Sequence, residues 1–213
     1  ADCTGHGIPG AFISMIGTIL LNEIHNSKNI TSPELVLNEL NRLMELTLDS
    51  GDHQMKDGMD IAFCTLDNIT NILSYSAANN PFWIISKKNE LSVFQNGTQI
   101  GTPPKMDLNG DFLFEIKADK DSIGKGYGER KQFSLNRVQL SPGDKIFIFS
   151  DGFADQFGGE KGKKYKYKPF KKLLLDNSHL SMEALNNKLN SEFNSWKGKL
   201  DQIDDICIMG VEV

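Results

Sequence analysis

The stretch Lys145–Lys172, KIFIFSDGFADQFGGEKGKKYKYKPFKK, indicates how the rest of the chain is organised. It opens on the apolar run Ile146–Phe149, which is typical of a strand buried on both faces. Asp151 and Gly152 follow, so a carboxylate lies at the rim of the predicted sheet and the glycine permits a sharp turn. Taken alone, the stretch fits two readings: an active site under a basic loop, or a strand, a turn and a solvated loop.

The composition is that of a globular protein. The 213 residues suit one domain, and 39% hydrophobic and 24% charged residues are enough to build a core. A net charge of −5 and a pI of about 5.4 argue against a general nucleic-acid binder. We see no signal peptide and no apolar run of the roughly 18 residues that a membrane span needs. We therefore expect a cytoplasmic domain without membrane contact of its own, tethered at most through a membrane sensor in the full-length protein.

The cysteines indicate a reducing compartment. Cys3, Cys64 and Cys207 are odd in number, far apart and outside any CxxC spacing, which argues against a zinc site. Cys64 and Cys207 lie in apolar runs, so we predict that both are small core residues.

Helical patterns enclose a block of short strands. One helix is predicted after Pro9 and a second from Pro33 to about Leu48, with Ser32 as N-cap. The apolar face of the first helix is predicted to hold Phe12, Met15, Ile16, Ile19, Leu20 and Ile24. Strands are predicted over residues 60–66, 71–77, 82–86, 91–95, 112–116 and 133–140, and a final buried strand over 206–213. Helices are predicted over 169–175 and 182–196.

This order favours an α+β fold of antiparallel strands and helices over a parallel βαβ fold. It also argues against a receiver domain, which is parallel. We interpret residues 1–213 as one domain. The opening ADCTGHG lacks a Met and reads as the middle of a motif, so we expect a truncated segment with more chain upstream.

Acidic residues occur at three points with a similar local context. Asp2 stands in a glycine loop before a helix, Asp151 ends a strand, and Asp204 and Asp205 precede one. Carboxylates at sheet rims form oxygen-ligand sites for Mg²⁺ or Mn²⁺. HExxH, GxSxG and GxxxxGK[ST] motifs are absent, which favours a metal-activated water as nucleophile. Ordinary surface aspartates in turns are the alternative.

Five motifs resemble the SpoIIE-type branch of the metal-dependent (PPM, protein phosphatase 2C-like) serine/threonine phosphatases, and they run in family order from one end of the chain to the other. They are Asp2-Cys-Thr-Gly-His-Gly-Ile-Pro-Gly-Ala, Gly58-Met-Asp, Ala77-Ala-Asn-Asn-Pro, Ser150-Asp-Gly-Phe-Ala-Asp-Gln-Phe-Gly-Gly and Gln202-Ile-Asp-Asp-Ile.

The resemblance implies a four-layer α-β-β-α sandwich of two antiparallel sheets flanked by helices, here lacking the first strand or strands. It implies a bacterial phosphoprotein phosphatase acting on phosphoserine or phosphothreonine, the output module of a sensor or signalling protein. Two Mn²⁺ or Mg²⁺ ions would activate a water, with no catalytic side chain. The partners implied are a phosphoprotein, such as an antagonist of an anti-sigma factor, and an upstream sensor region.

By motif match, the metal ligands implied are the carboxylates of Asp2, Asp151 and Asp204, the neighbouring Asp205, and the backbone carbonyl of Cys3. Two departures matter. The family's first metal-binding Asp lies upstream of this chain, so the 213 residues by themselves are expected to bind metal weakly or to be inactive. Thr4 stands where eukaryotic relatives carry a general-acid His, and we interpret His6 as a loop residue that steadies the turn.

Seven lysines between Lys161 and Lys172 stand out in an acidic chain. A solvated loop is one reading, and a basic flap that recruits a phosphoprotein is the other. For the flap we select Lys163, Lys164 and Lys166 as candidate substrate-binding residues.

Two hypotheses for function remain. The first is the phosphatase, and the alternative is a catalytically inactive PPM-fold interaction module. We interpret Asp155 and Gln156 as residues of the turn rather than of the metal shell, and Asp60 as a turn residue outside the metal set.

Overall fold

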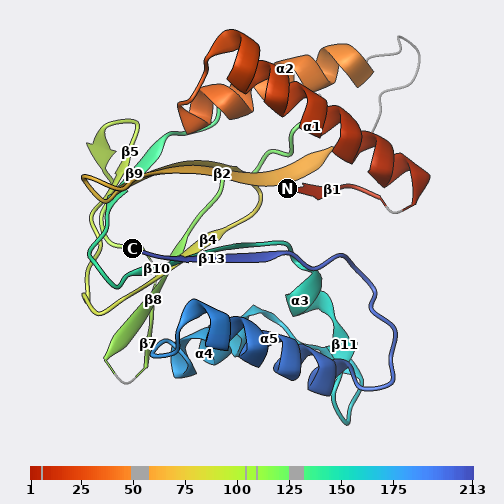
Figure 1. Cartoon of the computed structure of the whole chain (residues 1–213), viewed down its shortest axis with the longest axis vertical. Helices are drawn as coiled ribbons and strands as arrows, with labels where there is room; N and C mark the ends of the chain where they lie inside the picture. Colours follow the sequence, from red (N-terminus) through yellow and green to blue (C-terminus); the bar gives the residue numbers. More distant parts are fainter. Residues whose placement is uncertain (6, 49–57, 104, 109, 125–131) are drawn as a thin grey trace. The chain divides into compact units, whose positions relative to one another are not determined.

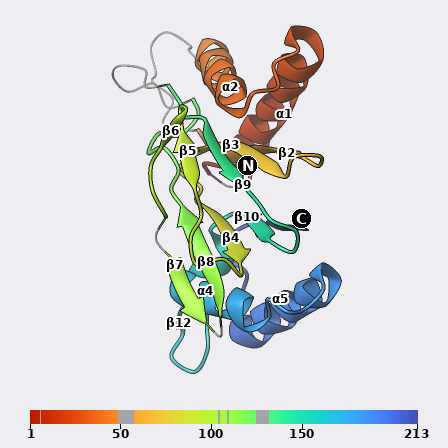
Figure 2. The same ribbon diagram turned by 90° about the vertical axis from the view of Figure 1, so that its left-hand side faces the viewer.

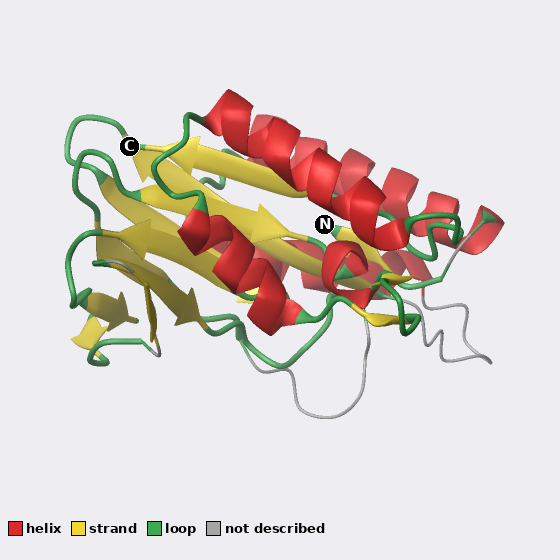
Figure 3. Cartoon of the chain, turned by 90° about the horizontal axis from the view of Figure 1, so that it is seen from below, coloured by secondary structure: helices red, strands yellow, loops and turns green. Residues whose placement is uncertain are grey.

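The computed structural model describes residues 1–213 except residues 6, 49–57, 104, 109 and 125–131 (Figure 1). The described residues form two compact units, each assembled from three stretches of chain. Unit 1 contains Ala1–Pro81, Ser92–Gly101 and Lys117–Gln139, and unit 2 contains Phe82–Leu91, Thr102–Ile116 and Leu140–Val213. Each unit has an antiparallel sheet and helices, drawn in yellow and red in Figure 3. The predicted α+β class with two antiparallel sheets is therefore confirmed.

Unit 1 is built on a six-stranded antiparallel sheet in the order β1-β2-β3-β9-β5-β6. The strands are β1 (Asp2–Cys3), β2 (Met59–Asp67), β3 (Ile72–Ala78), β5 (Val93–Gln95), β6 (Thr98–Gln99) and β9 (Asn136–Gln139). Strands β2 and β3, which correspond to the predicted strands 60–66 and 71–77, form an antiparallel hairpin. The Asp67 carboxylate closes its turn by accepting hydrogen bonds from the Ile69 and Thr70 amides at 2.8 and 3.1 Å. These two bonds lower the pKa of Asp67.

Two helices cover one face of this sheet, α1 (Ile8–Lys28) and α2 (Pro33–Leu48) (Figure 1). Their inward side chains form the core of unit 1 with residues of β2 and β3. The predicted α2 boundaries are correct, and its buried residues are Pro33, Val36, Leu37, Leu40 and Met44.

The predicted face of α1 is half right: Leu20 and Ile24 are buried and Ile16 packs against the core. Phe12, Met15 and Ile19 are exposed, whereas the buried residues are Gly10, Ile13, Gly17, Leu20 and Ile24. The buried side of α1 is the side that carries Gly10 and Gly17, because a glycine lets neighbouring residues approach the helix backbone closely. A Cβ on Gly17 would lie 2.2 Å from Cε of Met59, and one on Gly10 would lie 2.5 Å from the Gly5 carbonyl oxygen.

Helix α1 also contradicts the expectation that no segment of the chain is apolar enough over a sufficient length to span a membrane. By length and composition alone it is long and apolar enough to cross a membrane, contrary to the sequence reading. Ile13, Leu20 and Ile24 on its inner side nevertheless belong to the core of unit 1. Helix α1 thus packs on the core by one side and leaves large apolar residues exposed on the other.

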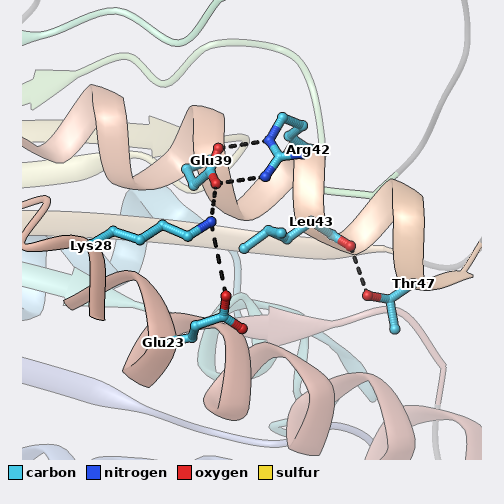
Figure 4. A network of polar contacts seen from close by, with 6 residues as sticks. All are labelled: Glu23, Lys28, Glu39, Arg42, Leu43 and Thr47. Atoms are coloured by element: carbon cyan, nitrogen blue, oxygen red, sulfur yellow. Dashed lines mark hydrogen bonds and ion pairs between the residues drawn. The ribbon is translucent and has the colours of Figure 1, made fainter. Parts of the chain in front are cut away.

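An ion-pair network joins the two helices on the surface of unit 1 (Figure 4). Glu39 accepts two hydrogen bonds of 2.8 Å from the Arg42 guanidinium and one from the Lys28 ammonium. Lys28 is also 3.9 Å from Glu23. The bonds from Arg42 and then Lys28 lower the pKa of Glu39 to about 2, because both favour the ionised carboxylate.

Unit 2 is built on a five-stranded antiparallel sheet in the order β13-β10-β4-β8-β7. Strands β10, β4, β8 and β7 are labelled in Figure 2. Its elements are β4 (Phe82–Ser86), β7 (Lys105–Leu108), β8 (Asp111–Ile116), β10 (Lys145–Phe149), α3 (Gly152–Asp155), β11 (Phe157–Gly158), β12 (Lys163–Lys164), α4 (Tyr167–Asp176), α5 (Met182–Lys197) and β13 (Ile208–Glu212). Strands β4 and β5 follow one another in the sequence but belong to different sheets. The short intervening segment therefore passes from one unit to the other.

The core of unit 2 gathers around Trp83, Phe149, Phe153 and Phe170. The rings of Phe153 and Phe170 stack at 4.5 Å, and those of Trp83 and Phe149 lie 4.2 Å apart. Strand β10 is buried as predicted, between β4 and β13. Aromatic burial of this kind supplies much of a core's stability.

Lys145 at the start of β10 is a buried cation with partners for its charge. Its ammonium donates hydrogen bonds of 2.6 Å to the carbonyl oxygens of Ser178 and Leu180 and lies 3.5 Å from the Glu212 carboxylate. The side chain is only 6% exposed. Lys145 therefore ties the sheet to the loop between α4 and α5.

The last strand differs from its prediction. β13 forms as expected, but Met209 and Val211 are 55% and 41% exposed. Cys207 just before it is exposed as well, so the prediction that it is a core residue is wrong, while Cys64 is half-buried. The physical reason is position: β13 is the outer strand of its sheet among the residues that the structure describes.

Candidate active site

Asp151 lies where β10 passes into helix α3. Strand β10 ends at Phe149, and Asp151 is the N-cap of α3, with backbone angles φ −78° and ψ −14°. The Asp155 amide donates to the Asp151 carbonyl at 3.0 Å. The half-buried Asp151 side chain thus stands at the rim of the unit 2 sheet, as the sequence predicts.

Ser150 joins this rim to the segment that carries the other two carboxylates. Its hydroxyl donates to the Asp205 carbonyl and accepts from the Cys207 amide, both at 2.9 Å. Its own amide donates to the Cys207 carbonyl at 2.9 Å. Since Ser150 is buried, these bonds fix residues 205–207 beside Asp151.

Gly152, which follows Asp151 in the sequence, also lies against the Asp205 carbonyl. A Cβ at this position would lie 2.4 Å from the Asp205 carbonyl oxygen, closer than a real side chain can approach. Glycine at position 152 is therefore required by packing as well as by the turn.

Gln156 holds the beginning of this segment. It is fully buried, and its amide nitrogen donates to the carbonyl oxygens of Phe157 and Asp201 at 3.0 and 2.9 Å. Its side-chain oxygen accepts from the Ile203 amide at 3.4 Å. Gln156 and Ser150 thus anchor the segment that carries Asp204 and Asp205 at both ends.

Asp204 and Asp205 themselves are exposed. The Asp205 amide donates to Asp204 Oδ1 at 2.8 Å, and Gln202 donates to the Asp204 carbonyl at 2.8 Å. The segment is ordered by short local bonds, while its carboxylates reach solvent beside the sheet rim.

The remaining predicted ligands, Asp2 and Cys3, belong to unit 1. They form β1, in register with Asp60 and Met59 of β2. The following loop is closed by a 2.8 Å bond from the Thr4 amide to the Gly58 carbonyl. His6 lies outside the described residues.

Asp60, at the start of β2, has local hydrogen-bond partners. Its Oδ1 accepts hydrogen bonds from Ser122 at 2.7 Å and from Asn79 at 3.0 Å. Asn79 has a left-handed φ of 58° at the end of β3. These three side chains join the turn after β3 to β2.

The structure brings Asp151, Asp204 and Asp205 into one neighbourhood of unit 2 and places Asp2 and Cys3 together in unit 1. Within the described residues, no three His, Cys, Asp or Glu side chains cluster tightly enough to hold a metal ion. The donors are nevertheless all oxygens, the chemistry that Mg²⁺ and Mn²⁺ prefer. The chemical nature of these donor atoms therefore suits Mg²⁺ or Mn²⁺.

The basic segment, residues 161–172, follows closely after helix α3, whose N-cap is Asp151. The Lys166 amide donates to the Ala154 carbonyl at 2.6 Å, and Lys166 has a φ of 74° that only glycine adopts readily. Lys164 pairs with Asp155 at 2.7 Å, whereas Lys163 and Lys166 are exposed and form no ion pair within the described chain. Asp155, the last residue of α3, is thus bonded to this basic segment.

Sequence reasoning missed the contacts of Ser150 and the carboxamide bonds of Gln156. The only sequence signal for Ser150 is a polar residue between an apolar strand and an Asp-Gly turn. The role of Gln156 depends on contacts with residues 201–203, far along the chain.

The whole chain matches the model of one protein family. The family model for stage II sporulation protein E (SpoIIE) matches residues 1–213. No curated protein matches the sequence.

Solved structures share the fold. The SiaA-PP2C domain of Pseudomonas aeruginosa is 22% identical with a TM-score of 0.78, over 99% of this chain and 73% of that one. The PP2C phosphatase domain of SpoIIE from Bacillus subtilis, with a fragment of its regulatory domain, is 17% identical with a TM-score of 0.64, over 98% of this chain and 52% of that one. RsbX in complex with magnesium is 14% identical with a TM-score of 0.55, over 97% of this chain and 76% of that one. The chain thus has a PP2C-type phosphatase fold and spans about half of the SpoIIE structure.

Proposed function

The chain belongs to the SpoIIE family, and we propose that it is the phosphatase module of a bacterial signalling protein, hydrolysing phosphoserine or phosphothreonine with the help of Mn²⁺ or Mg²⁺. The observation that carries this proposal is the joining of Asp151 to the Asp204–Asp205 segment through Ser150 and Gly152. Residues far apart in the sequence and predicted as ligands by motif are held side by side by buried bonds.

The roles proposed for the residues follow from their chemistry. The proposed ligands of divalent cations are Asp151, Asp204 and Asp205 in unit 2, and Asp2 and the Cys3 carbonyl in unit 1. The chemistry that such cations supply is a lowered pKa of a water molecule and neutralisation of phosphoryl charge. Ser150, Gly152 and Gln156 position the carboxylates. The relative RsbX in complex with magnesium supports the choice of a hard cation.

The test is hydrolysis of p-nitrophenyl phosphate with Mn²⁺, by the 213-residue chain and by a form extended with upstream coding sequence. Asp151→Asn should abolish turnover because it removes a ligand, whereas Asp107→Asn, an exposed aspartate of β7, should leave turnover unchanged. An extended form that is inactive, together with no effect of Asp151→Asn on metal binding, would favour the alternative of a catalytically inactive interaction module.

For substrate recognition we propose Lys163, Lys164 and Lys166. Exposed lysines attract phosphate and acidic side chains over long range. Lys163 and Lys166 are open to a ligand, while Lys164 would have to leave Asp155. The double variant Lys163→Gln/Lys166→Gln should lower kcat/KM for a phosphopeptide with acidic flanks and spare p-nitrophenyl phosphate. Lys188→Gln, an exposed change on α5, is the matched control. Equal losses on both substrates would contradict this assignment.

The partners proposed are a phosphoprotein, such as an antagonist of an anti-sigma factor, and a sensor region of the full-length protein. The SpoIIE structure, which includes a fragment of a regulatory domain, supports a signalling context. The cytoplasmic location stays a prediction.

A further inference from the structure

Strands β11 and β12 of unit 2 form a short hairpin that leads into the basic segment. Phe157 pairs with Lys164, and Gly158 pairs with Lys163. A two-stranded hairpin on its own is marginally stable at best in water. Contacts with other parts of unit 2 are therefore needed to hold this hairpin in one place.

Trp196, in the last turn of α5, packs against the first strand of the hairpin, and Figure 1 shows β11 beside one end of α5. The Gly159 amide donates to the Trp196 carbonyl at 2.8 Å. A Cβ on Gly158 would lie 2.0 Å from that carbonyl oxygen, and one on Gly159 would lie 2.8 Å from the indole ring. The two glycines therefore let the hairpin lie directly on Trp196.

The indole of Trp196 also contacts the chain next to the hairpin. Its Nε1 donates to the Gln156 carbonyl at 3.0 Å, and the Tyr165 amide donates to the same carbonyl at 3.0 Å. The rings of Trp196 and the buried Tyr165 meet edge to face, with their centroids 5.1 Å apart. Since Gln156 precedes β11 and Tyr165 follows β12, Trp196 holds both ends of the hairpin.

The register of the hairpin places its two paired lysines on opposite faces. Directly paired residues of antiparallel strands point to the same face, so Lys163 shares the face on which Gly158 meets Trp196. Lys164 is on the other face and forms the 2.7 Å ion pair with Asp155. Lys163 is exposed and has no ion pair in the part of the chain that the structure describes. The free lysine of the two strands therefore lies on the Trp196 side.

We propose that Trp196 is a positioning residue for substrate recognition, which holds the hairpin so that Lys163 is already oriented toward an acidic group of the phosphoprotein. This inference rests on the proposed role of the lysines in substrate recognition. A lysine on a fixed support loses less conformational freedom on binding than one on a free loop, and this raises affinity.

The role of Trp196 is separate from the support of the carboxylates. Its indole bonds to the main chain of Gln156, whereas the side chain of Gln156 bonds to Asp201 and Ile203 at the beginning of the acidic segment. Loss of the indole should therefore affect the lysines of the hairpin and spare the segment that carries Asp204.

The test measures binding of a fluorescein-labelled phosphoserine peptide with acidic flanks by fluorescence anisotropy, in EDTA so that turnover does not interfere. The 213-residue protein should bind the peptide, and Trp196→Leu should weaken binding about tenfold because the hairpin loses its support. Trp196→Phe keeps a ring against Tyr165 and should retain most of the affinity. Phe193→Leu is the matched control, because it removes from the same helix a ring that contacts Phe153.

A second variant reaches the same contact from the hairpin. Gly158→Ala should weaken peptide binding to a similar extent, because its φ is not positive and the added methyl group meets the Trp196 carbonyl. Amide hydrogen exchange of residues 157–164 should become faster in Trp196→Leu and Gly158→Ala, and should not change in Phe193→Leu. Exchange of residues 202–206 should stay as in the parent in all of these variants.

Three outcomes would overturn the proposal: no peptide binding by the parent protein, parental affinity in both Trp196→Leu and Gly158→Ala, or an equal loss of affinity in Phe193→Leu. The proposed phosphatase activity fails in a different way, through absence of p-nitrophenyl phosphate hydrolysis by the extended form. Peptide binding that depends on Trp196 in a protein without that hydrolysis would reject the activity and leave the positioning role in place.

Discussion

At the residue scale, the candidate site depends on small, buried groups behind the carboxylates. Ser150 satisfies both the Asp205 carbonyl and the Cys207 amide, and Gly152 leaves room for the same carbonyl. A buried backbone group without a partner is costly, so the geometry of the acidic segment depends on these neighbours.

Ser150→Ala should lower the free energy of unfolding by about 1–3 kcal/mol, because it removes two part-buried hydrogen bonds, to the Asp205 carbonyl and from the Cys207 amide, each worth roughly 0.5–1.5 kcal/mol. It should also weaken Mn²⁺ binding, measured by titration calorimetry, although Ser150 is not a proposed ligand. Ser92→Ala, at an exposed position, serves as control. Metal binding as tight as in the parent protein would contradict a positioning role for Ser150.

Glu39 is expected to make the free energy of unfolding depend on pH between about 2 and 4.5. Its pKa is lowered from 4.5 to about 2 in the folded protein by Arg42 and Lys28, so its contribution is complete above pH 4.5 and is lost as pH falls toward 2. The difference in unfolding free energy between the parent and Glu39→Gln should therefore shrink across this range in denaturant titrations. Glu90→Gln, at an exposed position, controls for the loss of one negative charge. A difference that stays constant down to pH 2 would rule out the network as its cause.

The sequence predicts the acidic positions well, since Asp-Gly after an apolar strand is a local signal and the motif order adds to it. It does not predict the bonds of Gln156 or Ser150, because their partners lie about 50 residues further on (45 to 57 positions). The proximity of Asp151 and Asp205 follows from those distant contacts.

At the scale of single elements, α1 is the most informative departure from prediction. Large apolar residues recur at helical spacing on more than one side of it, and periodicity alone does not choose between the sides. The choice is made by Gly10 and Gly17, which let the helix approach the Gly5 carbonyl and Met59 closely. For β13 the misjudged property is burial, because an apolar run does not reveal whether a strand is central or at an edge.

The two faces of α1 should respond differently to substitution. Ile13→Ala should cost about 2–5 kcal/mol of unfolding free energy, because Ile13 is 2% exposed in the core of unit 1. Phe12→Ser, at a residue 56% exposed, should change it by no more than about 0.5 kcal/mol. Urea denaturation of both variants measures this contrast. The reverse order of effects would mean that the face predicted by periodicity is the buried one.

At the scale of the whole molecule, the candidate ligands are divided between two units with separate cores. Unit 2 presents Asp151, Asp204 and Asp205, and unit 1 presents Asp2 and Cys3. Each unit is therefore expected to be stabilised by the ions that its own proposed ligands hold, since a ligand that binds only the folded state stabilises the part that contributes to its site.

Mn²⁺ should raise the melting temperature of the protein, with a stabilisation of about 2.7 kcal/mol when the ion is present at a hundred times its dissociation constant. Addition of EDTA should reverse the shift. Asp204→Asn should reduce it, whereas Asp176→Asn at an exposed position of α4 should not. A shift of equal size in the Asp204→Asn variant would exclude that carboxylate from the metal site.

The division of each unit into three stretches has a consequence for biosynthesis. The chain passes from one unit to the other five times, after Pro81, Leu91, Gly101, Ile116 and Gln139. On the ribosome, unit 1 lacks β9, the strand between β3 and β5, until residue 139 has been synthesised, and β10 of unit 2 has no outer neighbour until the last residues emerge. Nascent chains stalled before these points would therefore expose unpaired strands to chaperones, and no single proteolytic cut would release either unit intact.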